Sequence, residues 1–209
     1  MPLLFGTGYA LLISILLDLT SPSAYATVIS LFLPIFIVVG SMGGLTVFVN
    51  DRINGVLEYL IAYGVAARRL FADILLAGLA LGGIVAGTTL GIGLGLYVAE
   101  GNTIPPTLVE ALLVYSLPMG FATTAFTSTI GMYWSSLTSP REGMNSPTGI
   151  APLIGLAPPA ATLAVLATFG ESHFLAIVGG ATLVVVVVTS VLLRNVSTLL
   201  PNERFLSPA

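Results

Sequence analysis

Long runs without a charged residue constrain this chain more than any other feature of its sequence. Several such runs exceed the roughly 20 residues that a helix needs to cross a bilayer core of about 30 Å. Four of them cover residues 19–50, 74–99, 111–140 and 143–170. Only 7% of the 209 residues are charged, whereas soluble domains carry about 25%. A chain of this kind cannot keep its surface in water, so the sequence predicts an integral membrane protein.

The apolar runs are predicted to be helices, because a backbone in lipid must satisfy its own hydrogen bonds. A transmembrane barrel would need ten-residue segments of alternating polarity, which this sequence lacks. We therefore expect an all-α fold in a single transmembrane domain with six spans. The spans are expected at about residues 2–19, 25–49, 70–98, 107–137, 148–169 and 173–194.

All six arginines fall on one side of the membrane under this arrangement. They are Arg52, Arg68, Arg69, Arg141, Arg194 and Arg204. Four acidic residues fall on the opposite side, namely Asp18, Glu100, Glu110 and Glu171. Because cytoplasmic loops of membrane proteins are rich in Arg and Lys, we expect the arginine side to be cytoplasmic. The chain is then a multi-pass protein of the cell membrane with both termini in the cytoplasm.

The first apolar run has a second interpretation as a signal peptide. Ala24, Tyr25 and Ala26 resemble a cleavage site, and cleavage there would leave five spans. No positive charge precedes the apolar run, which favours a retained first span.

Several residue types are missing, and their absence excludes classes of chemistry. The chain has no lysine, so it cannot carry the P-loop that binds nucleotide phosphates. It has no cysteine for disulfides or thiolate metal sites, and its single His173 excludes a two-histidine zinc motif. We expect no catalytic residues, no metal site, no cofactor of its own and no nucleic-acid partner. The chain is not expected to be an enzyme.

Glycines at four-residue spacing mark one face of the predicted third span. They are Gly83, Gly87, Gly91 and Gly95. Such a face lets another helix approach by backbone contact. Two interpretations stay open: an interface with another subunit, or tight packing within one protomer.

Pro158 and Pro159 remove two backbone donors from the middle of the predicted fifth span. We expect the helix to kink or break there, either beside a substrate pathway or for packing alone. No ionisable residue lies near the middle of any predicted span. This argues against proton or ion coupling and favours a pathway lined by apolar and small hydroxyl side chains. A pathway of that kind would suit an amphipathic or lipid-like substrate.

The segment Asn50–Arg69 separates the second and third predicted spans and carries three of the arginines. Asn50 or Asp51 is predicted to cap a short amphipathic helix, and Gly64 is predicted to end it. The apolar positions recur at steps of three and four and form one buried face. They are Ile53, Val56, Leu57, Leu60 and Ile61. This helix is expected to lie along the cytoplasmic membrane surface, or to serve only as a passive connector.

The residues of this segment resemble the first cytoplasmic loop of type-2 ABC transporter permeases. The matching positions are Asp51, Arg52, Gly55, Leu57, Glu58, Leu60, Arg68 and Arg69. The motif covers about twenty residues, and the layout of six spans with cytoplasmic termini extends the likeness to most of the chain.

The resemblance implies that this segment holds the coupling helix, which docks on a separate ATPase subunit. Asp51, Arg52, Gly55 and Glu58 are then the partner-binding positions, with Arg68 and Arg69 at the entry of the next span. The partner would bind ATP and Mg, and the transporter would contain a second permease copy or paralogue as well.

The leading hypothesis is therefore a permease subunit that exports or flips an amphipathic substrate. The alternative is a membrane assembly or scaffold subunit that docks through the glycine face of the third span. A stand-alone channel is a third hypothesis. The absence of lysine, with abundant Gly, Ala, Val and Leu, suggests a prokaryotic source.

Overall fold

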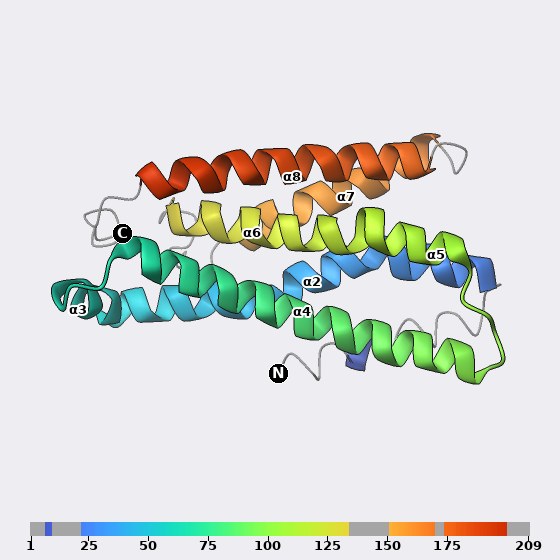
Figure 1. Ribbon diagram of the computed structural model, residues 1–209, viewed down its shortest axis with the longest axis horizontal. Coiled ribbons are helices and arrows are strands. Elements are labelled where there is room, and N and C mark those ends of the chain that lie inside the picture. Colours follow the sequence, from blue (N-terminus) through green and yellow to red (C-terminus); the bar gives the residue numbers. More distant parts are fainter. Residues whose placement is uncertain (1–6, 10–21, 134–150, 170–173, 200–209) are drawn as a thin grey trace, which may run out of the picture.

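The computed structural model describes residues 7–9, 22–133, 151–169 and 174–199 of the chain (Figure 1). Each regular element in these ranges is helical, so the all-α prediction is confirmed for the described residues. In chain order the elements are α2 (Pro22–Ile53), α3 (Val56–Ala62), α4 (Ala67–Ala99), α5 (Pro106–Ala111), the π-helix η1 (Leu112–Ser116), α6 (Leu117–Tyr133), α7 (Ala151–Phe169) and α8 (Phe174–Leu199).

Four of the described helical segments are long and apolar enough to cross a membrane. They are Val28–Arg52, Ala67–Ala99, Pro106–Met132 and Ala176–Asn195, and they correspond to the predicted second, third, fourth and sixth spans. The predicted fifth span corresponds to α7, in which Leu153–Val165 forms a shorter apolar helix. The predicted first span lies outside the described residues, apart from residues 7–9.

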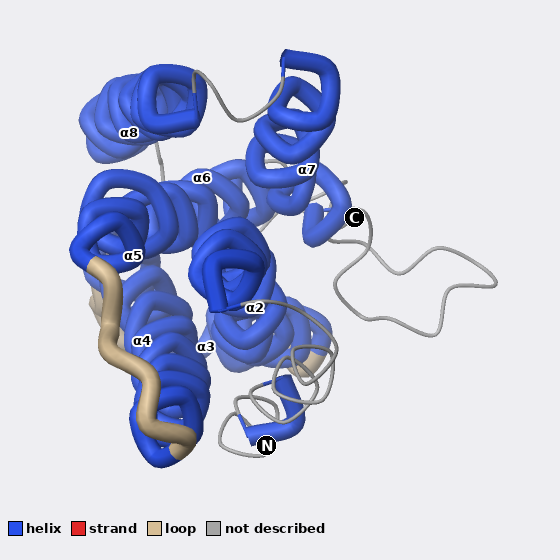
Figure 2. Tube along the Cα trace, turned by 90° about the vertical axis from the view of Figure 1, so that its right-hand side faces the viewer, coloured by secondary structure: helices blue, strands red, loops and turns tan. Residues whose placement is uncertain are grey.

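The long helices run side by side along one axis, and successive helices point in opposite directions (Figure 1). Viewed along that axis, α2 lies in the middle of the bundle (Figure 2). It contacts α4, α6 and α7. The short α3 joins the end of α2 to the start of α4 and lies at one end of the bundle.

The predicted fourth span is one helical stretch that contains a π-helical turn. Pro118 has no N–H to donate, so the regular α-helical bonding pattern is interrupted just before it. The preceding residue, Leu117, donates its backbone N–H to the carbonyl of Leu112, five residues back. The wider turn of η1 ends at Ser116, two residues before Pro118.

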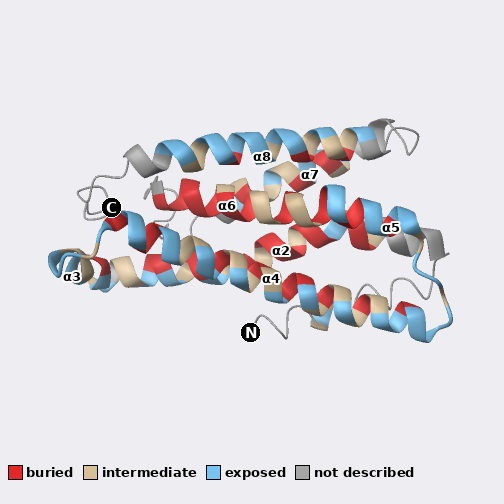
Figure 3. Ribbon diagram, in the orientation of Figure 1, coloured by how far each residue is buried: buried red, intermediate tan, exposed pale blue. Residues whose placement is uncertain are grey.

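The described part of the bundle exposes many large apolar side chains and buries hydroxyl groups. Figure 3 shows where the buried and exposed residues lie along the helices. Large side chains on the outer faces are open, with Leu183 on α8 exposed by 65% and Leu76 on α4 by 61%. The buried polar residues in the described part are all serine or threonine. An apolar exterior of this kind belongs in lipid rather than water.

Buried hydroxyls link the helices around α6. The hydroxyl of Ser116 donates to the carbonyl of Ser30 on α2 at 2.7 Å. The hydroxyl of Thr124 donates to that of Ser41, also on α2, at 3.1 Å. On the other side, Thr189 of α8 donates to the carbonyl of Ala122 at 3.2 Å. These interhelical bonds satisfy hydroxyl groups that have no water to bond within the bundle.

The backbones of α2 and α4 approach each other closely at Gly44 and Gly78. A Cβ added to Gly44 would stand 2.8 Å from the backbone nitrogen of Gly78 and 2.9 Å from its Cα. One helical turn away, a Cβ added at Gly40 of α2 would overlap the side chain of Val85 on α4. One added at Gly82 of α4 would lie close to Ile37 of α2. Glycine therefore sets the spacing between these two helices.

Candidate functional site

The end of the bundle that carries α3 contains all the partner-binding positions predicted from the sequence. Asp51 and Arg52 lie in the last turn of α2, and Gly55 lies in the turn that follows. Glu58 is on α3. Arg68 and Arg69 lie in the first turn of α4. The structure therefore brings these residues, which span three helices, to one end of the molecule.

The turn between α2 and α3 is made by the backbone. Asn54 donates its N–H to the carbonyl of Asn50 at 3.0 Å, and Gly55 donates to that of Arg52 at 3.2 Å. Gly55 has φ +72°, a left-handed conformation that favours glycine. The chain thus ends one helix and begins the next within two residues.

The predicted capping of α3 by Asn50 or Asp51 is wrong. Both residues lie inside α2, which continues to Ile53. Nothing in the sequence from Asn50 to Ile53 breaks a helix, and the break comes only at Asn54 and Gly55. The residue before α3 is Gly55, which makes no side-chain capping bond.

The inner face of α3 packs against the ends of α2 and α4. Leu57 is only 1% exposed. Leu60 and Ile61 are partly buried against the same apolar cluster, which includes Phe48 and Phe71. Predicted burial is confirmed at Leu57 and holds in part at Leu60 and Ile61. It is wrong for Val56, which is exposed because it lies a quarter-turn or more from Leu57 on the helix.

Gly64 ends α3, as predicted. Its φ is +87°, and its N–H donates to the carbonyl of Ile61 at 2.9 Å. Val65 donates to the carbonyl of Leu60 at 3.0 Å, which completes a Schellman motif. Both ends of α3 are thus fixed by glycine turns, and Leu57 in its first turn is buried against the bundle.

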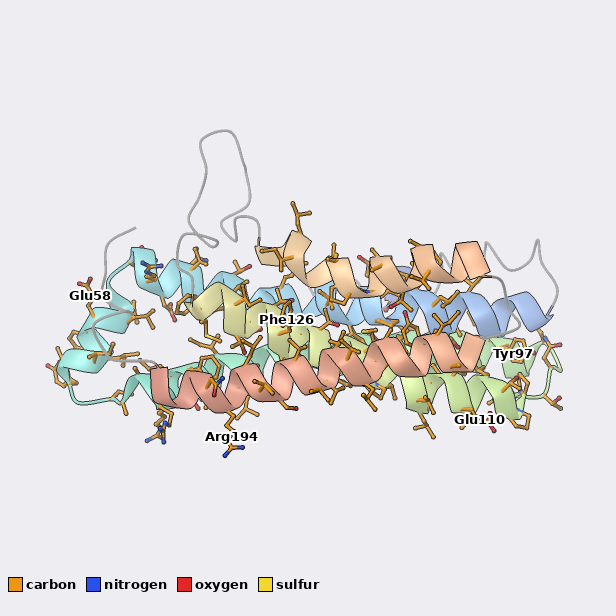
Figure 4. All side chains as sticks on the ribbon, turned by 90° about the horizontal axis from the view of Figure 1, so that it is seen from above. Glu58, Tyr97, Glu110, Phe126 and Arg194 are labelled. Carbon is orange, nitrogen blue, oxygen red and sulfur yellow. The ribbon has the colours of Figure 1, made fainter. Side chains whose placement is uncertain are left out.

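The outer face of α3 carries charge and aromatic rings. Glu58 is exposed and points away from the end of the bundle (Figure 4). Tyr59 and Tyr63 are exposed by 60% and 73%, and their ring centroids lie 4.4 Å apart. The sequence reasoning missed this pair. The sequence feature that indicates the pair is the four-residue spacing of the two tyrosines, which places both on the side of the helix away from Leu57.

The two ends of the bundle differ in charge. Tyr97 and Glu110 lie at the end opposite Glu58, and Arg194 lies in the half of the bundle nearer to α3 (Figure 4). Glu100 follows the last residue of α4, so it also belongs to the end away from α3. Among the described residues, the end with Glu100 and Glu110 has no basic side chain.

The glycine face predicted on α4 is open along most of its length. A Cβ added at Gly87, Gly91 or Gly95 would meet no atom within 4 Å, and one at Gly83 would reach only the ring of Phe121, at 3.9 Å. Packing within the protomer was one of the two interpretations, and the described residues do not provide it at the three open positions.

A kink or a break was predicted at Pro158 and Pro159, and the helix does not break there. The helix α7 is continuous from Ala151 to Phe169 with both prolines inside it. Each proline removes one backbone donor from the helix. Nearby, Thr162 donates its hydroxyl to the carbonyl of Pro158 at 2.9 Å. Gly155 lies so close to Thr127 of α6 that an added Cβ would overlap it.

The described residues contain no group of three His, Asp or Glu side chains that could hold a metal ion. The end of the molecule that carries α3 presents the carboxylate of Glu58 and two exposed tyrosine rings on this helix and its C-cap. Arginines lie at the adjoining ends of α2 and α4. Comparison with protein-family models, with characterised proteins and with solved structures finds no match for this chain.

Proposed function

We propose that this chain is the membrane-spanning permease subunit of an ATP-driven ABC transporter. In this proposal it has six spans with both termini in the cytoplasm, and it exports or flips an amphipathic or lipid-like substrate. A separate ATPase subunit docks on the segment around α3 and supplies ATP and Mg.

The observation that carries the proposal is the arrangement of α3. This helix is anchored by Leu57, bounded by the glycine turns at Gly55 and Gly64, and presents Glu58 outward. A passive connector needs neither a fixed orientation nor an exposed charged face. A helix that transmits force from a soluble subunit needs both, because a loosely held helix would move without moving the spans.

The charge distribution supports a cytoplasmic position for α3. Arg52, Arg68 and Arg69 lie at its end of the bundle, while Glu100 and Glu110 lie at the other end. Under the positive-inside rule, the arginine end faces the cytoplasm. An ATPase made in the cytoplasm would then reach α3 without crossing the membrane.

The interior of the bundle supports an amphipathic rather than an ionic substrate. The buried polar residues of the described part are serines and threonines, and no charged side chain there is buried. A pathway for protons or ions usually contains ionisable groups within the membrane. Energy from ATP, delivered through α3, requires no such groups in the spans.

Reversing the charge at Glu58 tests the proposal. We expect Glu58→Arg to reduce the ATPase that co-purifies with the tagged chain by about tenfold or more, because a mismatched charge in an interface costs several kcal/mol. Glu100→Arg is the matched control, since Glu100 is also exposed but lies at the opposite end. Equal recovery of the ATPase with both variants would show that α3 is not its docking site.

The alternative function is a scaffold subunit that assembles through the glycine face of α4. The open space at Gly87, Gly91 and Gly95 favours some contact with another helix in the membrane. In a transporter, a second permease copy or paralogue could fill it. A purified complex held together by this face but lacking any ATPase would favour the scaffold instead.

A further inference from the structure

Tyr59 and Tyr63 form an ordered aromatic surface on α3. Their rings lie 4.4 Å apart at an angle of 40°, and both side chains are more than half exposed. Residues four apart share one face of a helix. With about 100° per residue, Tyr59 lies about 200° from Leu57 and Tyr63 about 240°. The tyrosine pair therefore lies on the side of α3 opposite the anchor that holds it to the bundle.

The outward face of α3 differs from the lipid-facing surface of the bundle. The outer faces of the long helices expose aliphatic side chains such as Leu76 and Leu183. On α3, the tyrosine rings stand next to Glu58, an exposed carboxylate. Anionic lipid headgroups attract basic segments, so Arg68 and Arg69 at the start of α4 suit a membrane surface, whereas the acidic Glu58 beside the rings is a poor match for it.

The position of α3 also favours a soluble partner. The helix lies at the end of the bundle, where α2 ends and α4 begins (Figure 1). Glu58 is exposed on it, on the outside of this end (Figure 4). Tyrosine is among the residues that contribute most to protein interfaces, because it buries a large rigid area with few rotatable bonds. Contact between the two tilted rings restricts them further before binding, which reduces the entropy lost on association.

We infer that Tyr59 and Tyr63 are the anchor by which a soluble protein partner binds this chain. The partner would supply an apolar cleft for the two rings and a basic side chain opposite Glu58. This inference rests on the proposed function in naming the partner as the ATPase subunit. It goes further by assigning the binding free energy to Tyr59 and Tyr63, which lie in the segment but are not among the positions that match the family motif.

Photo-crosslinking from the two positions tests the inference. p-Benzoylphenylalanine replaces Tyr59 or Tyr63 in the full-length chain, in its own membranes, and Leu76 carries the same group as a lipid-facing control. The crosslinked products are identified by mass spectrometry. We expect peptides of the co-purifying ATPase at positions 59 and 63 and none at position 76. Products with lipid alone at positions 59 and 63 would overturn the inference.

Substitution provides the matched measurement of affinity. We expect Tyr59→Ala with Tyr63→Ala to weaken binding of the purified ATPase by about tenfold or more, the loss typical of central aromatic residues. Tyr59→Phe with Tyr63→Phe should keep most of the affinity, and Leu76→Ala should keep all of it. The thermal unfolding midpoint of each variant in detergent shows that it is folded. Unchanged affinity in the folded double alanine variant would overturn the inference.

The two proposals fail in different ways. If the ATPase co-purifies but crosslinks only elsewhere on the chain, the transporter function stands and the tyrosine anchor is wrong. If a soluble protein other than an ATPase crosslinks through both tyrosines, the docking surface stands, and both the transporter function and the identity given to the partner fail.

Discussion

Replacing Gly44 with leucine is expected to prevent α2 and α4 from packing and to cause the largest loss of stability of any single change considered. The side chain would have to enter a space where the backbone of Gly78 stands 2.8 Å from the new Cβ. Backbone cannot rotate aside as a side chain can. We expect a loss of about 3 kcal/mol or more, measured as a lower thermal unfolding midpoint or as failure to recover folded protein in detergent.

Gly180→Leu is the matched control for this experiment. Gly180 lies within α8, also in a long helix, but an added Cβ there would meet nothing within 4 Å. The control should stay close to the wild-type midpoint. If Gly44→Leu were as stable as Gly180→Leu, the close packing of α2 on α4 would be contradicted.

Replacing Gly55 with proline is expected to leave the bundle folded and to abolish coupling to the ATPase. Gly55 has φ +72°, whereas proline is fixed near −65° and lacks the N–H that bonds to Arg52. The turn must then change direction, which moves α3 and its exposed face. We expect recovery of the co-purified ATPase to fall by about tenfold or more, with a local cost of about 3 kcal/mol.

Gly101→Pro separates coupling from general damage. Gly101 follows α4 at the opposite end, has φ +85° and donates its N–H to the carbonyl of Val98 at 2.9 Å. The same substitution should therefore cost similar stability there without reducing the bound ATPase. Equal loss of the ATPase in both variants would mean that folding, and not the orientation of α3, explains the effect.

The sequence was sufficient to predict the helices and the position of α3, because both depend on local patterns. Four of the predicted spans correspond to the four described long helices, and Gly64 predicted the end of α3. The start of α3 was predicted wrongly. Asn50 and Asp51 are good capping residues, but α2 continues past them to the glycine turn at Gly55.

The glycine patterns show where local reasoning fails. The stripe from Gly83 to Gly95 is regular, yet none of the described residues packs against Gly87, Gly91 or Gly95. The close helix contact uses Gly44 and Gly78 instead. A repeat on one helix does not say which face meets a neighbour, because that depends on the matching small residue on the other helix. The register of α2 against α4 is therefore set by how the two helices pack together, and the pattern on either helix alone does not determine it.

The sequence pattern identified the charged residues of the candidate site but did not identify its two tyrosines. Glu58 was found through the likeness of its loop to a known motif. Tyr59 and Tyr63 do not belong to that motif, and an apolar-periodicity argument counts only the buried face. Their orientation became visible once Leu57 was seen to be the buried anchor of α3.

The mass and composition of the complex that this chain forms in its own membranes test the central claim most directly. Native mass spectrometry of the tagged chain, extracted from its membranes with mild detergent, is the measurement. The proposed function predicts a complex of two permease subunits with two P-loop ATPase subunits, and addition of ATP with Mg should give hydrolysis. A stable complex that contains no ATPase, or the chain recovered alone under conditions that preserve other membrane assemblies, would contradict it.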